Sequence, residues 1–291
     1  MNTSRAWFLA CRPKTLSVSL SPVLLGTAIA WHDSGALLWL PLLAAALGAA
    51  FIQIGTNLFN DVGDFLRGTD TPERIGPKRA TAEGWLSVGK VKAGAWLSFG
   101  LAFLCGIYLV IHGGWPIVVI GLASLAAGWA YTSGPKPIAY GPLGELFVFT
   151  FFGLVAVGGS YYLQTGTIAA NVLIAASMLG LHAAAVITVN NYRDLDGDAR
   201  HGKNTLAVHF GRPATQCIYT AEMLLPYGLL AALAGQLGWL ALLPLLSLPL
   251  ALRLTRRFRH ETPGPAFNQI LAATAGFQLV FALLMSLAFC A

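Results

Sequence analysis

Two groups of asparagine and aspartate side chains, far apart in the sequence, are the residues of this chain best suited to do chemistry. Each group stands at the end of a long apolar segment and contains the spacing Asn-x-x-x-Asp, formed by Asn57 and Asp61 in one group and by Asn190 and Asp194 in the other. On a helix, this spacing places both side chains on one face. Further carboxylates complete the two clusters: Asp64, Asp70, Asp196 and Asp198.

These side chains offer the ligands that magnesium takes in proteins. Mg²⁺ binds oxygen atoms, usually one or two carboxylates together with water and phosphate oxygens. Each cluster could supply such a set. A single acidic residue near a membrane surface would be explained as a solvated helix end, but two matched clusters are not. We therefore predict paired sites for divalent cations that together hold a polyanionic ligand.

The composition indicates a membrane protein. Of the 291 residues, 56% are hydrophobic and 10% are charged, whereas an average soluble domain has about 25% charged residues. The net charge of +6 does not indicate a nucleic-acid partner, because the basic residues follow the membrane topology. The four cysteines have no metal or redox spacing. Nothing in the sequence indicates an obligate protein partner.

About 20 consecutive apolar residues cross a bilayer as a helix. On that basis we expect an all-α membrane protein of one domain, residues 1–291, with nine transmembrane helices around a central cavity. The expected spans are 15–32, 37–59, 93–112, 116–133, 145–163, 168–190, 217–234, 238–254 and 267–289.

The basic residues orient these spans. With nine spans, all 18 lysines and arginines fall on the side of the N-terminus. Basic residues remain cytoplasmic, so the N-terminus and both clusters are expected to face the cytoplasm, in a bacterial inner membrane. The clusters follow spans two and six. An offset of four spans indicates two parallel pseudo-repeats plus one further span.

Four segments resemble the UbiA superfamily of intramembrane aromatic prenyltransferases, and most closely its branch that prenylates 1,4-dihydroxy-2-naphthoate on the way to menaquinone. The resemblance covers nearly the whole chain. One motif departs from the broad superfamily pattern, because Gly68 stands where its last aspartate is expected and Asp70 follows two residues later. The segments that carry the resemblance are 12–26, 57–78, 153–164 and 190–206.

The resemblance implies a Mg²⁺-dependent enzyme that joins a polyprenyl diphosphate to an aromatic acceptor, with loss of diphosphate and carbon dioxide. It implies catalytic roles for Asp61, Asp64, Asp194 and Asp198. The metal-site residues are expected to be these four with Asn57, Asp70 and Asn190. The expected diphosphate contacts are Arg12, Arg67, Lys78, Lys136 and Lys203. Aromatic side chains of the fifth span could surround an allylic cation.

Two other interpretations remain open at this point, and a third is discounted. The acceptor could be 4-hydroxybenzoate, homogentisate or a tetrapyrrole. The chain could be a cation-coupled transporter, although transporters place their sites near the middle of the bilayer rather than at one face. Residues 196–200 resemble the start of a CDP-alcohol transferase motif, but the rest of that motif does not follow. The sequence does not fix the prenyl chain length, the oligomeric state, or the roles of Asp196, His182 and Glu222.

Overall fold

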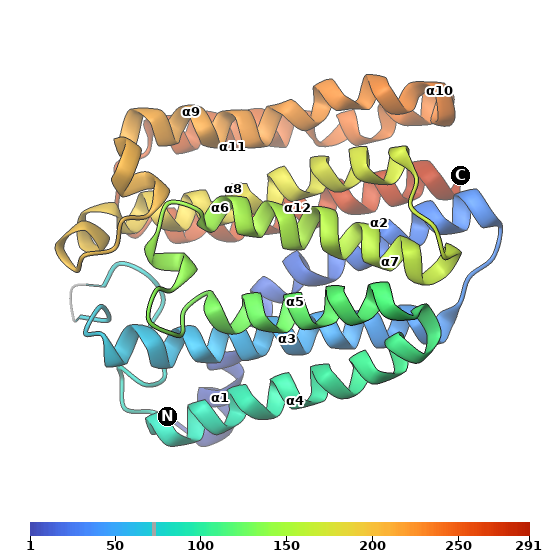
Figure 1. Cartoon of the computed structure of the whole chain (residues 1–291). Helices are drawn as coiled ribbons and strands as arrows, with labels where there is room; N and C mark the ends of the chain where they lie inside the picture. Colours follow the sequence, from blue (N-terminus) through green and yellow to red (C-terminus); the bar gives the residue numbers. More distant parts are fainter. Residues whose placement is uncertain (72–73) are drawn as a thin grey trace.

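The computed structural model describes residues 1–71 and 74–291, and in these residues every regular element is a helix (Figure 1). The principal α-helices are α1 (Thr3–Cys11), α2 (Leu16–Ser34), α3 (Trp39–Leu66), α4 (Val88–Gly113), α5 (Trp115–Ala130), α6 (Gly144–Val148), α7 (Ala156–Thr165), α8 (Ala170–Arg200), α9 (Leu206–Leu229), α10 (Ala234–Leu237), α11 (Leu248–His260) and α12 (Phe267–Cys290). A π-helical segment, Phe149–Val155, joins α6 to α7. Four 3₁₀ segments are Pro13–Thr15, Ile138–Tyr140, Leu230–Leu233 and Gly238–Ser247.

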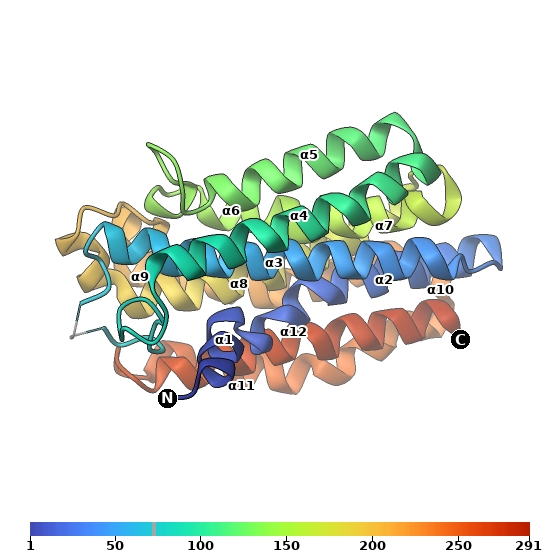
Figure 2. The same ribbon diagram turned by 90° about the horizontal axis from the view of Figure 1, so that it is seen from below.

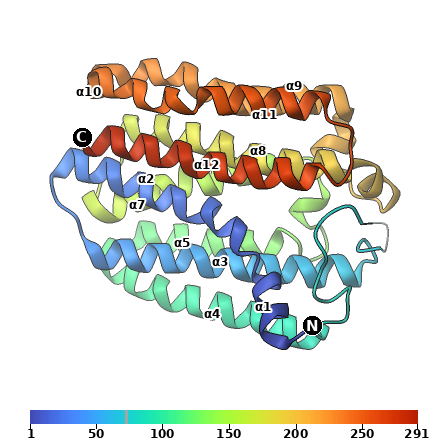
Figure 3. The ribbon, with the colours of Figure 1, turned by 180° about the vertical axis from the view of Figure 1, so that it is seen from behind.

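Seven helical stretches in the described residues are long and apolar enough to cross a membrane. The expected count of nine stays a prediction for two reasons. Helix α5 has only 16 residues. The stretch Leu206–His260 is continuous in helical character, but α9 and α11 within it contact each other and run side by side (Figures 1 and 3). The chain therefore turns back near α10.

The two acidic clusters lie on helices rather than in the loops that follow them. Helix α3 continues beyond the expected end at residue 59 to Leu66, and α8 continues beyond residue 190 to Arg200. The Asn-x-x-x-Asp pairs therefore share a helical face, as the spacing predicts. Both helices end at the same end of the bundle, shown on the left in Figure 1.

The helices form a bundle in which α8 is the most buried long segment. It contacts α9, α12 and the π-helical segment, while α2 packs between α12 and α7. The shared core contains Leu25, Val157, Leu179 and Phe281. Helix α3 packs mainly on α4, and α1 lies beside that pair at the end of the bundle where α3 and α8 finish (Figures 2 and 3).

Two contacts bring helix backbones close together at glycine. A Cβ atom on Gly26 of α2 would lie 2.2 Å from the carbonyl oxygen of Val157 on α7. A Cβ on Gly153 would lie 2.7 Å from the Cα of Gly180 on α8. Small residues permit this close packing, which replaces the hydrophobic effect as the attraction between helices in lipid. The contacts fix the wall of the bundle formed by α2, α7 and α8.

We predict that Gly26→Ala destabilises the protein, because α2 and α7 must separate to admit the methyl group. Overpacking of this kind costs about 1–3 kcal/mol. The measurement is the midpoint of thermal unfolding in detergent. The matched control is Gly100→Ala in α4, where an added Cβ meets nothing within 4 Å. Equal midpoints for the two variants would contradict the close contact of α2 with α7.

Candidate active site

A cavity of about 1250 Å³ opens at the end of the bundle where α3 and α8 finish. Its polar end is lined by acidic and basic side chains of both clusters and of the loops that follow them. Its other end is lined by apolar residues of α4, α5 and α7. The cavity therefore joins a charged chamber to an elongated apolar one.

In the first cluster, Asp61 is almost fully buried and fastens the loop that follows α3. Its carboxylate accepts hydrogen bonds from the backbone N–H of Ala80, at 3.0 Å, and from the hydroxyl of Thr81. The Thr81 hydroxyl also lies 3.0 Å from the backbone oxygen of Asp61. Asp61 lines the cavity, and it also holds residues 80–81 against α3.

Asp64 lies one helical turn further along α3 and is surrounded by donors. Lys203 Nζ lies 3.2 Å from Asp64 Oδ1, the Tyr140 hydroxyl donates to the same oxygen at 3.0 Å, and Arg79 lies 3.8 Å from Oδ2. Only 4% of Asp64 is exposed. A buried carboxylate requires compensation of this kind.

Lys203 connects the two clusters. Its ammonium group lies 3.2 Å from Asp64 on α3 and 3.7 Å from Asp198 on α8, and it lies over the ring of Tyr140. Burial alone would lower the pKa of Lys203, but the two carboxylates outweigh that effect and raise it. The side chain is therefore a fixed positive charge between two acidic helices.

In the second cluster, Arg193 holds the polar side chains in place. It makes two hydrogen bonds to the carboxylate of Asp194, at 2.8 and 2.6 Å, and single bonds to Asn190 Oδ1 and Asn268 Oδ1, each at 2.8 Å. Asn268 of α12 in turn donates to the backbone oxygen of Ile75. Arg193 is 2% exposed, so this network fixes the second cluster and the loop after α3 together.

Two predicted acidic residues have other surroundings. Asp70 follows α3 and pairs with Arg74 at 2.6 Å, and its Oδ2 lacks a partner in the described residues. Burial raises the pKa of Asp70 to about 6, although Arg74 opposes that shift. The side chain of Asp196 is 71% exposed and pairs with Arg212. Asp70 is absent from the cavity wall, whereas Asp64, Asp194 and Asp198 are on it.

The structure shows which of the basic residues line the cavity, and the sequence alone did not. Arg12 and Lys203 line the cavity, as does the partly exposed Lys78, whose ammonium pairs with Glu83. Arg67 instead donates to the backbone oxygens of Thr132 and Gly134, and Lys136 is exposed outside the cavity wall. Five further lysines and arginines that the sequence analysis did not name line the cavity: Lys14, Arg74, Arg79, Arg193 and Arg200.

A signal for Arg79 was available, since it follows Lys78 directly in the loop after the first cluster. What the sequence could not show is how two neighbouring side chains are partnered. Lys78, whose side chain is 70% exposed, pairs with Glu83, whereas Arg79 approaches Asp64. Asn60, which the sequence analysis did not name, also lines the cavity, and its Oδ1 is buried without a partner in the described residues.

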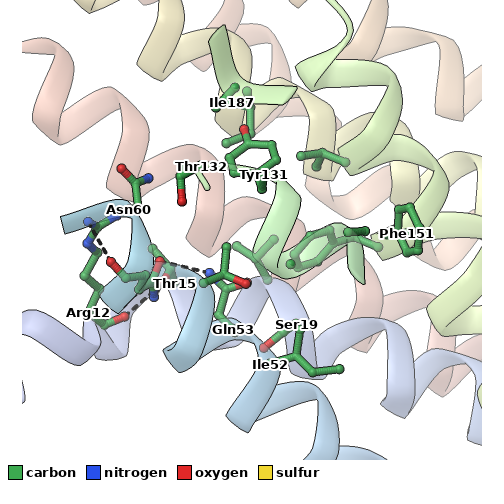
Figure 4. A pocket seen from close by; sticks show the side chains of 18 of the residues that line it. Arg12, Thr15, Ser19, Ile52, Gln53, Asn60, Tyr131, Thr132, Phe151 and Ile187 are labelled. Carbon is green, nitrogen blue, oxygen red and sulfur yellow. Dashed lines mark hydrogen bonds between the residues drawn. The ribbon is translucent and has the colours of Figure 1, made fainter. Parts of the chain in front are cut away.

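Asn57 links α3 to the beginning of α2. Its amide donates to Cys11 O and to Thr15 Oγ1, and its Oδ1 accepts from Gln53. Arg12, in a left-handed backbone conformation with φ 51°, donates to the backbone oxygen of Asn57. Figure 4 shows Arg12, Thr15 and Gln53 together on one wall of the cavity.

The apolar end of the cavity includes aromatic side chains from the π-helical segment and its neighbours, among them Phe147, Phe151 and Phe152. π-helical turns are found mostly at functional sites. Two buried polar residues without an assigned role, His182 and Glu222, are absent from the cavity lining. His182 instead packs edge-on against Phe277 and Phe281, which is a packing role.

Within residues 1–71 and 74–291, no three His, Cys, Asp or Glu side chains converge to hold a metal without other ligands. The carboxylates and amide oxygens that line the cavity are nevertheless hard oxygen donors. Mg²⁺ commonly takes only one or two protein carboxylates and completes its shell with water and phosphate. The residues therefore fit a divalent cation that arrives with an anionic ligand.

Comparison with known proteins agrees with this geometry. Residues 19–277 match the model of the UbiA prenyltransferase family. The chain is 34% identical to the 1,4-dihydroxy-2-naphthoate octaprenyltransferase of Haemophilus influenzae, over 97% of this chain and 95% of that protein. It is 36% identical to the enzyme of the same name from Mycobacterium tuberculosis, over 95% and 94% of the two chains.

Solved structures share the fold. A UbiA homolog from Archaeoglobus fulgidus, bound to GPP and Mg²⁺, superposes with a TM-score of 0.73 at 15% identity and covers 98% of this chain and 99% of its own. A UbiA homolog from Aeropyrum pernix gives a TM-score of 0.70 at 15% identity, over 95% and 97% of the two chains.

We predict that magnesium pyrophosphate stabilises the wild-type protein against heat by about 5 °C at saturation. Lys203→Ala should abolish this shift, because it removes the cation between Asp64 and Asp198. Lys136→Ala is the control and should retain the shift, since Lys136 is exposed outside the cavity wall. A shift lost equally in both variants would contradict the assignment.

Proposed function

This chain belongs to the UbiA prenyltransferase family, and on that premise we propose that it transfers a polyprenyl group from a polyprenyl diphosphate to 1,4-dihydroxy-2-naphthoate. Diphosphate and carbon dioxide leave, and the product is a demethylmenaquinol. The curated relatives named for this activity match nearly the full length of the chain at 33–36% identity.

The observation that carries the proposal is the pairing of two clusters across one cavity. Carboxylates from α3 and α8 face a shared cation, Lys203, at the head of an apolar chamber. A prenyl diphosphate has the same division, because a highly charged head is joined to a hydrocarbon chain. The polar end suits the diphosphate and the apolar end suits the chain.

We assign the diphosphate contacts to six of the basic residues that line the cavity: Arg12, Arg74, Lys78, Arg79, Arg200 and Lys203. As the allylic carbon–oxygen bond breaks, its electron pair moves to the leaving diphosphate. Positive side chains fixed near that oxygen stabilise the transition state more than the ground state. Asp61, Asp64, Asp194 and Asp198, with Asn57, Asn60 and Asn190 beside them, would hold Mg²⁺. The ion would supply further positive charge to the leaving group.

The remaining steps depend on the apolar chamber. The allylic cation is kept from water by the cavity wall, and the faces of Phe147, Phe151 and Phe152 attract a positive charge. The electron-rich ring then bonds to the cation through the carbon that carries the carboxylate. The carbon–carboxylate bond breaks, its electron pair returns to the ring, and carbon dioxide leaves.

The prenyl chain has a route out of the cavity. Ile107 and Ile111 of α4 and Leu122 of α5 line the apolar end of the cavity and are also exposed on the bundle surface. In a bilayer that surface faces lipid. A chain longer than the cavity could extend between these side chains without meeting water.

The test is turnover by the purified protein with geranyl diphosphate, Mg²⁺ and a panel of acceptors, with the product analysed by mass spectrometry. We expect a prenylated product of 1,4-dihydroxy-2-naphthoate that lacks the carboxyl group. Asp64→Asn and Asp194→Asn should each lower turnover by at least about 100-fold. Glu261→Gln is the carboxylate control, since Glu261 pairs with Arg257 away from the cavity.

The outcomes separate the alternatives. A product formed only from 4-hydroxybenzoate or homogentisate would replace the acceptor and keep the reaction class. Turnover that persists at full rate in excess chelator would refute the use of a metal.

We also propose the topology that the charge distribution supports. The chain passes the inner membrane of a bacterium nine times, with α5 as one pass and with α9 and α11 as two. The N-terminus and the charged end of the cavity face the cytoplasm. The antiparallel course of α9 and α11 supports the two passes (Figure 3).

Single cysteines placed in a cysteine-free background test this topology in intact cells. Thr167→Cys and Gly235→Cys should react with a membrane-impermeant maleimide, because both precede a turn at the end remote from the clusters. Lys136→Cys should react only after the membrane is permeabilised. If Thr167→Cys were labelled in intact cells and Gly235→Cys were not, the proposal that α9 and α11 are two separate membrane passes would be wrong.

A further inference from the structure

The orientation of one polar side chain in the cavity wall is fixed by a residue that lies outside the cavity. Asn191 of α8 lines the cavity beside the second cluster. Its amide Nδ2 donates to Oε1 of Glu145 at 2.8 Å. Glu145 is 4% exposed, lies in the first turn of α6, and is not itself part of the cavity wall. The contact therefore lies behind the surface that a ligand would touch.

The chemistry of this contact determines which way the carboxamide faces. Oε1 of Glu145 accepts a hydrogen bond from the NH₂ group of Asn191, so this group of the carboxamide faces Glu145. The Oδ1 atom of Asn191 is left facing away from Glu145, and no donor among the described residues bonds to it. The wall thus presents an unused acceptor.

The surroundings of Asn191 suit a flat, mostly apolar ligand. Ile187 lies one helical turn before Asn191 on α8, and Val148 and Phe152 belong to the same apolar cluster as Ile187 and also line the cavity. Tyr131, Thr132 and Ile187 lie close together in Figure 4. The hydroxyl of Thr132 is buried and has no partner within the described part of the chain. A ligand placed here would pack against hydrocarbon and find a few isolated polar atoms.

An isolated acceptor in an apolar wall selects a ligand that carries a donor at that point. A carboxylate or a diphosphate offers no donor, whereas a phenolic hydroxyl offers one. We propose that Asn191 Oδ1 accepts a hydrogen bond from a ring hydroxyl of the aromatic acceptor, and that Glu145 is the positioning residue that holds the amide in this orientation. The inference rests on the proposed function and names a specificity contact of the same site.

The contact should discriminate between acceptors. A site built to hydrogen-bond a hydroxyl is left with an unpaired buried atom when the ligand lacks it. Removing the hydroxyl also changes the nucleophilicity of the ring, but that chemical effect is the same in every variant. Comparing two acceptors in two proteins, as in a double-mutant cycle, therefore isolates the contribution of the contact between Asn191 and the hydroxyl.

The experiment measures kcat/KM with 1,4-dihydroxy-2-naphthoate, 1-hydroxy-2-naphthoate and 4-hydroxy-2-naphthoate, for the wild type and for Asn191→Leu. Deleting one of the two hydroxyls from the acceptor should lower kcat/KM in both proteins. For that hydroxyl, we expect the fold-loss in the wild type to be about 10-fold to 100-fold larger than the fold-loss in Asn191→Leu. The KM for prenyl diphosphate should remain within about twofold of wild type, because the proposed diphosphate contacts are basic side chains other than Asn191.

Two further variants keep the test decisive. Asn191→Ala repeats the cycle with a side chain too small to obstruct its neighbours, in case leucine prevents folding. Glu145→Gln tests the positioning role, because a glutamine amide can donate or accept and so lets Asn191 face either way. We expect Glu145→Gln to reduce the hydroxyl discrimination while Asn191 itself is unchanged.

Equal losses with all three acceptors in the Asn191 variants would overturn the inference and give Asn191 a structural role. Unchanged discrimination in Glu145→Gln would overturn the positioning role. These results differ from failure of the proposed function, which would appear as a wild-type protein that prenylates none of the three naphthoates.

Discussion

The charged end of the cavity depends on keeping like-charged carboxylates of two helices close together. Asp64 and Asp198 approach the same ammonium group, that of Lys203. In a low-dielectric surrounding, carboxylates without such a counter-charge would repel and become protonated. Arg193 supplies the same kind of counter-charge to Asp194. The ends of α3 and α8 are therefore joined through basic side chains, and the cavity lies between them.

The same polar residues fasten the loop that covers this end. Asp61 holds Ala80 and Thr81, while Arg193 reaches Ile75 through Asn268. Both clusters thus bind one loop, each at a different point.

The cavity wall has a division that matches a reaction between lipid-soluble molecules. Charged side chains are confined to one end, where α3 and α8 finish, and aromatic and aliphatic side chains line the remainder. The charged end neutralises a leaving anion. The apolar end excludes the water that would consume a cation. The wall also carries amide and hydroxyl groups, among them those of Asn60, Thr132 and Asn191.

The sequence by itself determined the helical class, the positions of most long helices, the location of both clusters and, through its motifs, the family. These properties follow from hydropathy and from spacing along one helix, which neighbouring residues settle locally. Lys203 and Arg12, which the sequence predicts as diphosphate contacts, both line the cavity.

Only the tertiary structure decided which side chains meet. Arg67 and Lys136 have the same charge as Arg79 and Lys203, yet Arg67 bonds to backbone oxygens and Lys136 is exposed, while the other two face Asp64. The orientation of Asn191 depends on Glu145, which is distant in sequence. The physical reason is that the path of the loops and the packing of the helices determine which side chains meet. The local periodicity of the sequence predicts neither.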